Sequence, residues 1–464
     1  MAEIQFNFDN VMENRVGDDG LRPGELDEKA AKAAVAAFHS RVQSGDIGFP
    51  LLPEDTRTAT AISEFADDLR PQIDDVLLVG IGGSALGAYA LDVAMRGPHP
   101  VQSPIGNSQR KATSSARPGS VRPRLVVLDN VDPGLVAAAL DGLNPKRTAV
   151  CVIAKSGSTA ETLSTFMIVR EWLTVALGKK ARSRIIAITD AQKGDLLAIA
   201  RQEQYPLFFV PSNVGGRFSV FSTVGLVPAA LIGLDIKRLL RGAKEANARC
   251  WQTDVKQNPA LASALVHHAL NTKRRKSIEV VFAYSSYMWG SAFWYRQLWA
   301  ESLGKRVNRN GDTVECGQTP VAALGVTDQH SQVQLYIEGP RDKMITFWEV
   351  AKPRVDLKIP RDFLQYDSCR YLAGKKLGDL FSAERRATEA ALTEVGRPNC
   401  RWTLPRVDEQ TMGAFFQMLE FQTAFAGELY GVDAFDQPGV ELGKKLTYGL
   451  MGRKGYEDFA KRIT

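Results

Sequence analysis

A glycine-rich turn at 80–85 is the first feature of this sequence that could do chemistry. The apolar run 76–79 stops in Gly-Ile-Gly-Gly-Ser-Ala, and helical spacing then resumes. A strand that ends in glycines and opens a helix is typical of a turn whose backbone N–H groups bind a phosphate. Taken alone, this turn fits a dinucleotide site, a sugar-phosphate site or a purely structural tight turn.

A second loop of the same kind follows the apolar run 148–153. The segment Lys155–Thr162 reads Lys-Ser-Gly-Ser-Thr-Ala-Glu-Thr, so several hydroxyls stand beside a lysine at the start of a helical pattern. An ordinary helix cap would explain one hydroxyl, but it does not explain the three of Ser156, Ser158 and Thr159. Two such loops from one sheet could hold one compact phosphate, whereas a dinucleotide site does not require the second loop. The sequence therefore favours a sugar phosphate over a dinucleotide.

Two further segments could supply charged groups for catalysis. Arg217 follows two glycines, which allow the backbone to approach closely and direct the guanidinium inward, although a surface arginine after a turn is the simpler alternative. Gln297 and Glu301 are four residues apart and share a helix face with the aromatic Trp294. A carboxylate on such a face is either a general base or a surface residue with apolar neighbours.

The last two segments carry a histidine and a lysine. His330 is one of five histidines and stands in the polar turn Thr327–Ser331, where an isolated histidine is often simply solvated. Near the C-terminus, Gln437 precedes a Pro-Gly turn, and Lys444 lies one helical turn after Glu441. Each pattern alone is compatible with an ordinary surface element.

Taken together and in this order, the six segments resemble the glucose-6-phosphate isomerase (phosphoglucose isomerase) family. The resemblance extends from about Gly45 to the end of the chain. It implies two flavodoxin-like (SIS-type) parallel-sheet subdomains with helical arms at both ends. It also implies reversible isomerisation of glucose 6-phosphate and fructose 6-phosphate through a cis-enediolate, without cofactor or metal, in glycolysis and gluconeogenesis.

The resemblance also implies a role for each motif residue. Glu301 is expected to move the proton between C2 and C1, and His330 is expected to open the sugar ring with the help of Lys444. Arg217 is expected to stabilise the enediolate oxygens. The expected phosphate and substrate contacts are Gly83, Ser84, Lys155, Ser156, Thr159, Gln297 and Gln437. Family members usually have serine where this chain has Ala154, so one hydroxyl is absent from the second loop.

The same resemblance implies a homodimer in which the histidine reaches the active site from the neighbouring subunit. Two functions of other classes are the alternatives. A regulatory module that senses sugar phosphates would keep the loops and lack the acid–base residues. A nicotinamide-dependent dehydrogenase requires an acidic residue about twenty positions after the glycine turn, where this chain has none at a strand end. The joint presence of Glu301, His330 and Lys444 argues against the regulatory module, and the dehydrogenase would be retained by a dye or NAD column.

The elements that must position these residues alternate between apolar runs and amphipathic helices, which predicts parallel sheets covered on both faces. Helices are expected at 27–43, 289–302 and 411–430. The segment Pro98–Pro123 is poor in apolar residues and is predicted to be a mobile surface insertion. The expected strands are 76–80, 124–128, 148–153, 184–188, 206–210, 278–284, 321–326 and 333–338.

These elements divide the chain into four expected regions. Residues 1–60 form an N-terminal helical arm, 61–236 a first α/β subdomain, 237–430 a second one, and 431–464 a C-terminal helical arm with the lysine motif. A length of 464 residues is sufficient for two such cores.

Composition narrows the choice of partners and compartment. With 44% hydrophobic and 24% charged residues, the sequence is that of an ordinary globular protein. The net charge of +6 is modest and suits a small anionic substrate better than nucleic acid. The five cysteines show no paired spacing, and the N-terminus lacks the pattern of a signal peptide, so we expect a cytoplasmic protein that does not contact membranes.

Overall fold

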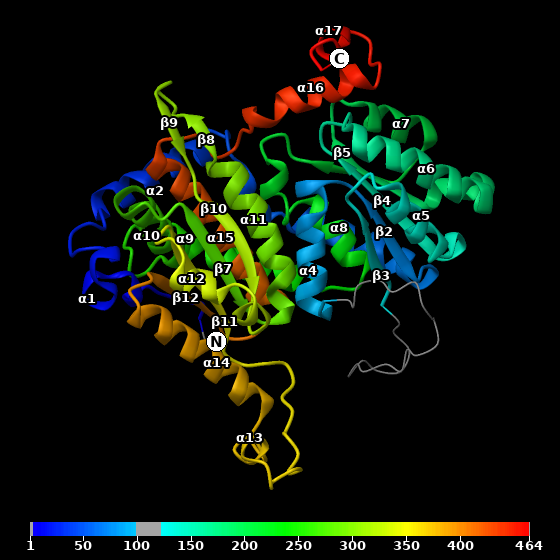
Figure 1. The fold of residues 1–464 in the computed structure, drawn as a ribbon. Helices are drawn as coiled ribbons and strands as arrows, with labels where there is room; N and C mark the ends of the chain where they lie inside the picture. Colours follow the sequence, from blue (N-terminus) through cyan, green and yellow to red (C-terminus); the bar gives the residue numbers. More distant parts are fainter. Residues whose placement is uncertain (1–2, 99–121, 464) are drawn as a thin grey trace.

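The computed structural model of the chain describes residues 3–98 and 122–463, and it contains two five-stranded sheets with helices on both faces of each (Figure 1). The predicted mobile insertion Pro98–Pro123 lies almost entirely outside the described residues. No helix in the described ranges combines the length and apolar character needed to cross a membrane.

The first sheet is entirely parallel. Its first strand in the chain, β2 (Asp75–Val79), lies between the second strand, β3 (Arg124–Leu128), and the third strand, β4 (Thr148–Ala154). This is the strand order of flavodoxin-like folds. The glycine turn and the Lys155 loop follow adjacent strands, so both loops lie at the same edge of the sheet. In spatial order the strands are β3, β2, β4, β5 (Ile185–Asp190) and β6 (Leu207–Val210).

The second sheet repeats this strand order and adds one antiparallel strand at its edge. A separate two-stranded hairpin, β8 (Lys305–Val307) with β9 (Thr313–Cys316), follows the helix that carries Glu301. In spatial order the sheet contains β1 (Gln5–Asn7), β12 (Asn399–Leu404), β11 (Lys343–Val350), β7 (Ile278–Tyr284) and β10 (Thr319–Leu324).

The helices pack in layers around the two sheets. Those between the sheets are α4 (Leu86–Arg96), α8 (Thr223–Leu231), α9 (Ile236–Cys250), α11 (Trp289–Leu303) and α15 (Glu409–Tyr430), with α2 (Glu28–Gln43) and α3 (Thr56–Leu69) beside them. The outer layers contain α5 (Pro133–Asp141), α6 (Ala160–Leu177), α7 (Asp195–Glu203), α12 (Val333–Glu338) and α14 (Leu377–Glu394). Helix α10 (Pro259–Arg274) packs beside α15 on the inner face of the second sheet. The short helices are α1 (Glu13–Val16), α13 (Asp367–Arg370), α16 (Glu441–Leu450) and α17 (Glu457–Ala460).

The strands of the first sheet are buried on both faces because successive side chains point to opposite sides. Val76 and Leu78 belong to the core between the sheets, whereas Leu77 and Val79 belong to the core beneath α5–α7. Burial of apolar side chains on both faces is what a continuous hydrophobic strand requires. The two cores thereby hold the carboxyl ends of β2 and β4 in place.

The predicted α/β class with parallel sheets is confirmed, and one predicted element is wrong. Residues 333–338 form helix α12 rather than a strand. Val333, Tyr336 and Ile337 are spaced three and four residues apart, so they share one face and pack together on the second sheet. Strands β11 and β12, which lie in the middle of the second sheet, were not among the expected strands.

The four predicted regions stay predictions, but one feature differs from the expectation for the N-terminal arm. Within 1–60, strand β1 pairs with β12 and so extends the second sheet. All five cysteines are free, and Cys151, Cys250 and Cys400 are buried.

Candidate functional site

Arg217 lies at the centre of the candidate site, where four segments of the chain meet. Its guanidinium is almost fully buried, with 3% of the side chain exposed. Nε donates to Ser302 Oγ (2.7 Å), Nη1 to Gln437 Oε1 (3.0 Å), and Nη2 to the carbonyls of Ala434 (2.6 Å) and Asp436 (2.8 Å). Burial lowers the pKa of Arg217, yet a guanidinium keeps its proton at any ordinary pH. The structure therefore holds a fixed positive charge in this place.

Glu301 is the carboxylate that faces this charge. Its Oε1 lies 3.4 Å from Arg217 Nη1, and its Oε2 accepts a hydrogen bond from Gln297 Nε2 (2.9 Å). The side chain is 28% exposed, so the carboxylate is partly desolvated and still reachable. A carboxylate held between an amide and a guanidinium is fixed in orientation, as a general base must be.

The glycine turn packs directly against both groups. Gly82 has φ of +58°, and a Cβ there would lie 2.9 Å from Gln297 Nε2. A Cβ on Gly83 would lie 2.4 Å from the carbonyl carbon of Gly216, the residue before Arg217. Only glycine fits at these two positions, because any side chain would displace the Gln297 amide or the Arg217 loop. Ser84 is half-buried at the end of the turn, just before α4.

The second loop places its hydroxyls at the start of α6. Ser156 Oγ lies 3.3 Å from Thr159 Oγ1, and Thr159 is the cap residue of the helix. Lys155 forms its side-chain hydrogen bonds outside this loop. Its Nζ donates to the carbonyls of Ser212 and Val214 (both 2.7 Å), and burial lowers its pKa. Lys155 therefore ties this loop to the segment that leads into Arg217.

His330 forms no hydrogen bond or ion pair with Arg217 or Glu301 in the described part of the chain. It ends a short 3₁₀ turn after β10, and it is exposed. The turn itself is held by Asp328, which accepts from the Leu324 N–H (2.7 Å) and from Ser331 Oγ (2.6 Å). The imidazole thus extends from a fixed loop into solvent.

Lys444 also lies outside the group around Arg217. It is exposed on α16, and its Nζ forms an ion pair with Glu441 on the same helix (2.7 Å). In Figure 1 the red segment α16–α17 projects from the body of the molecule above α7. Gln437, seven residues earlier, does reach Arg217, so the structure brings the start of this motif to the site and not its lysine.

Two residues that support the site were not predicted from the sequence. Ser302 accepts the hydrogen bond from Arg217 Nε, and Lys305 Nζ donates to the carbonyls of Glu301 (2.9 Å) and Ser302 (2.8 Å). Burial lowers the pKa of Lys305. Their places beside Glu301 in the segment Glu-Ser-Leu-Gly-Lys were the signal that could have identified them.

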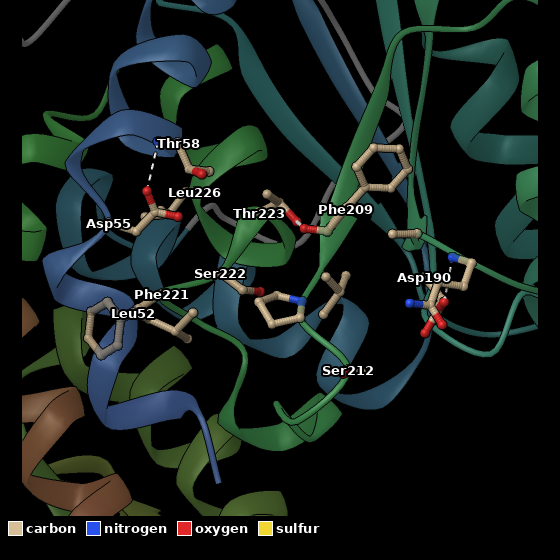
Figure 2. A pocket seen from close by; sticks show the side chains of 14 residues that line it. Leu52, Asp55, Thr58, Asp190, Phe209, Ser212, Phe221, Ser222, Thr223 and Leu226 are labelled. Carbon is tan, nitrogen blue, oxygen red and sulfur yellow. Dashed lines mark hydrogen bonds between the residues drawn. The ribbon is translucent and has the colours of Figure 1, made fainter. Parts of the chain in front are cut away.

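A cavity of about 230 Å³ adjoins the site at the carboxyl ends of β5 and β6 (Figure 2). Two of its hydroxyls already have acceptors, since Thr223 Oγ1 donates to the Phe209 carbonyl (3.0 Å) and Ser222 Oγ to the Ser219 carbonyl (2.7 Å). Asp190 accepts from the backbone of Gln192 (2.8 Å). Neither Arg217 nor Glu301 lines this cavity, and we assign no catalytic role to it.

Comparison with protein families gives one match over most of the chain. The family described as phosphoglucose isomerase matches residues 63–453. A glucose-6-phosphate isomerase of Carboxydothermus hydrogenoformans is 41% identical over 99% of this chain and 97% of its own length. A glucose-6-phosphate isomerase of Rubrobacter xylanophilus is 40% identical over 98% of this chain and its own full length.

Two solved structures are also similar. A hypothetical protein from Thermus thermophilus superposes with a TM-score of 0.82 at 35% identity, covering 97% of this chain and 100% of the other. A glucose-6-phosphate isomerase from Chlamydia trachomatis superposes with a TM-score of 0.74 at 22% identity, covering 88% and 76%. The second likeness supports the fold alone.

Proposed function

Since the chain belongs to the phosphoglucose isomerase family, we propose that it interconverts glucose 6-phosphate and fructose 6-phosphate. The observation that carries this proposal is the pair formed by Glu301 and Arg217, with 3.4 Å between Oε1 and Nη1. Such a pair combines a base with a fixed positive charge, which is what proton transfer next to a carbonyl requires. The reaction would belong to glycolysis and gluconeogenesis.

In the proposed mechanism Glu301 removes the C2 proton of the open-chain aldose phosphate and delivers a proton to C1. The proton of the C2 hydroxyl passes to the C1 oxygen, so the C2 hydroxyl becomes the carbonyl, the C1 carbonyl becomes a hydroxyl, and Glu301 ends the cycle as a carboxylate. Arg217 stabilises the negative charge on the oxygens of the cis-enediolate. Gln297 Oε1 is buried and has no hydrogen-bond partner in the described part of the chain, so it is suited to accept from a substrate hydroxyl.

The proposed phosphate position lies between the turn 82–84 and the loop 155–159. Both loops follow adjacent parallel strands, and α4 and α6 start from them. Helix N-termini carry unpaired N–H groups and a partial positive charge, which attract a phosphate dianion. Binding energy from this remote group can orient the reacting carbons beside Glu301.

We further propose that the chain acts as a homodimer in which His330 of one subunit completes the site of the other. Two observations support this proposal. His330 is exposed and forms no hydrogen bond with Glu301 among the described residues, and several large apolar side chains are exposed on the segment 357–377, which projects from the body of the molecule (Figure 1). Such a surface is typical of a protein–protein contact. In the same proposal Lys444 assists His330 at the ring oxygen.

The regulatory alternative is not favoured by any of these observations. A protein that only senses sugar phosphates needs the two loops, but it does not need a carboxylate fixed beside a buried guanidinium. Both groups are present here, and the relatives reported above are named as isomerases.

The phosphate position can be tested with inorganic phosphate as a competitor. In the Ser156→Ala/Thr159→Ala variant we expect the inhibition constant of phosphate and the KM for fructose 6-phosphate to rise together by at least about tenfold, because two hydrogen bonds to a dianion are lost. Steady-state kinetics with varied phosphate measures both constants.

Ser164→Ala on the same helix is the matched control, since its hydroxyl is exposed and donates to the Glu161 carbonyl. This control variant should behave as the unmodified protein. Unchanged inhibition by phosphate in the double variant would place the phosphate elsewhere.

A further inference from the structure

The second sheet has its own crevice at the position that corresponds to the phosphate loops of the first. In the first sheet the turn 82–84 and the loop 155–159 follow β2 and β4, the neighbouring strands at which the strand order reverses. The strand order of the second sheet reverses between β7 and β11. In open parallel sheets, ligands bind outside the carboxyl ends of the strands at this reversal.

A cavity of about 330 Å³ occupies this position in the second sheet. Tyr284 and Val350, the last residues of β7 and β11, line it together with the residues that follow each strand. One face of α14 closes it, through Gly378, Phe381, Ser382 and Arg385. The volume is that of a small-molecule site.

The charged groups of this cavity leave an excess of positive charge. Glu349 is paired with Arg385 (3.0 Å) and with Arg401 (3.3 Å), and both arginines also contact Glu389, so these four charges balance. Lys352 forms no ion pair among residues 3–98 and 122–463. An exposed ammonium at the mouth of a cavity attracts an anion.

Arg354 adds a second positive charge that has no ion pair among the described residues. It donates to the backbone carbonyls of Ala94 (2.7 Å), Met95 and Val407 (3.0 Å), and no carboxylate forms an ion pair with it in the described ranges. Arg385 contributes a polar atom as well, since its Nε is buried without a hydrogen-bond partner among the described residues, and the side chain is 6% exposed.

The remaining walls combine hydroxyls with aromatic rings. Ser285, Ser286 and Ser382 line the cavity, and none of these hydroxyls donates to a protein acceptor in the part of the chain that the structure describes. Tyr284, Tyr287 and Phe381 provide aromatic surface. The cavity therefore offers donors and positive charge for an acidic group and apolar walls for a flat ring.

We propose that this cavity binds a small organic phosphate with a flat ring, of the size of a nucleoside monophosphate, independently of the isomerase substrate. The position would connect such a ligand to the catalytic residues. Arg354 holds the last carbonyls of α4, which starts at the turn 82–84, and Tyr287 precedes α11, which carries Gln297 and Glu301. The two helices lie side by side between the sheets (Figure 1).

Calorimetric titration of the full-length protein with adenosine 5′-monophosphate tests the proposal. Glucitol 6-phosphate, which has no carbonyl to isomerise, is present in excess so that the substrate site is filled. We expect one nucleotide to bind per chain. Adenosine, which lacks the phosphate, and ribose 5-phosphate, which lacks the ring, should each bind at least about tenfold more weakly, since each loses one set of contacts.

Two variants locate the bound nucleotide. Lys352→Glu should weaken binding by at least about tenfold by reversing the charge, and Ser382→Trp should abolish it by filling the cavity. Both residues are exposed, so folding should be retained, and circular dichroism checks this. Lys179→Glu, at an exposed position on the first subdomain, is the matched control and should bind as the unmodified protein does.

Three results would overturn the proposal. One is the absence of saturable binding by adenosine, guanosine, cytidine and uridine monophosphates and by phenyl phosphate. The second is nucleotide binding that neither Lys352→Glu nor Ser382→Trp affects. The third is nucleotide binding that is seen only after the protein is diluted to monomers. A second copy of the chain would then be the occupant of the cavity in the dimer. The Glu301→Gln variant should still bind the nucleotide, so failure here is distinguishable from failure of the proposed isomerase function.

Discussion

Replacing Glu301 by glutamine is expected to lower kcat by at least about 10²-fold, because the amide cannot accept the proton from C2. Glutamine has the same shape and keeps a neighbour for Arg217 and Gln297, so the buried guanidinium should retain its hydrogen bonds to Ser302 and to the Ala434 and Asp436 carbonyls. The inhibition constant of inorganic phosphate should change little. Steady-state kinetics with fructose 6-phosphate measures kcat and the inhibition constant in one experiment.

Glu171→Gln is the matched control for this variant. Glu171 lies exposed on α6, and its replacement changes the net charge equally. This control variant should keep the turnover of the unmodified protein. If Glu301→Gln also turned over at a normal rate, the assignment of Glu301 as the base would be wrong.

The second large effect is recovery of activity in mixed dimers. Glu301→Ala and His330→Ala should each be nearly inactive as homodimers. When the two are unfolded and refolded together, a mixed dimer contains one site with both lesions and one with neither, if His330 serves the site of its partner. With random pairing half of the dimers are mixed, so about a quarter of the unmodified activity should return.

Differently tagged chains allow the mixed dimers to be isolated, and ultracentrifugation establishes their size. The refolded parent variants, each mixed with itself, are the controls. Mixed dimers as inactive as both parents would exclude a shared site, and His330 would then act within its own chain or have no catalytic role.

Strands with apolar side chains on both faces were the most readily predicted elements. Those of the first sheet were predicted nearly to their bounds, because both faces are buried and no polar residue interrupts them. Residues 333–338 were assigned to a strand because a short apolar run has no periodicity long enough to distinguish the two states. Strand β12 contains Asn399, Arg401 and Thr403. These polar side chains interrupt the apolar run, so the strand was not predicted.

The candidate site was predictable as a set of motifs and not as a geometry. The sequence placed Gln297 and Glu301 on one helix face, and the structure joins them by a hydrogen bond. It could not place Lys155, because the carbonyls of Ser212 and Val214 that hold its ammonium come from a segment more than fifty residues away. Lys155 follows β4 and the two carbonyls follow β6 of the same sheet, so the contact depends on the order of the strands in the sheet, which local sequence does not encode.

The same limit applies to the tertiary position of the C-terminal motif. Its spacing predicted Glu441 and Lys444 one helical turn apart, and their ion pair agrees with this. Whether α16 approaches Glu301 depends on contacts beyond its own helix, and in the single chain the arm projects outward (Figure 1).

The most direct test of the central claim is conversion of fructose 6-phosphate by the purified protein. The protein is incubated with fructose 6-phosphate and EDTA in the absence of nicotinamide cofactors, and the products are followed by phosphorus NMR, with Glu301→Gln measured in parallel. The account predicts that glucose 6-phosphate appears until a constant ratio of the two sugars is reached, and that the variant forms it at least about 10²-fold more slowly. Absence of glucose 6-phosphate, with a folded and phosphate-binding protein, would contradict it.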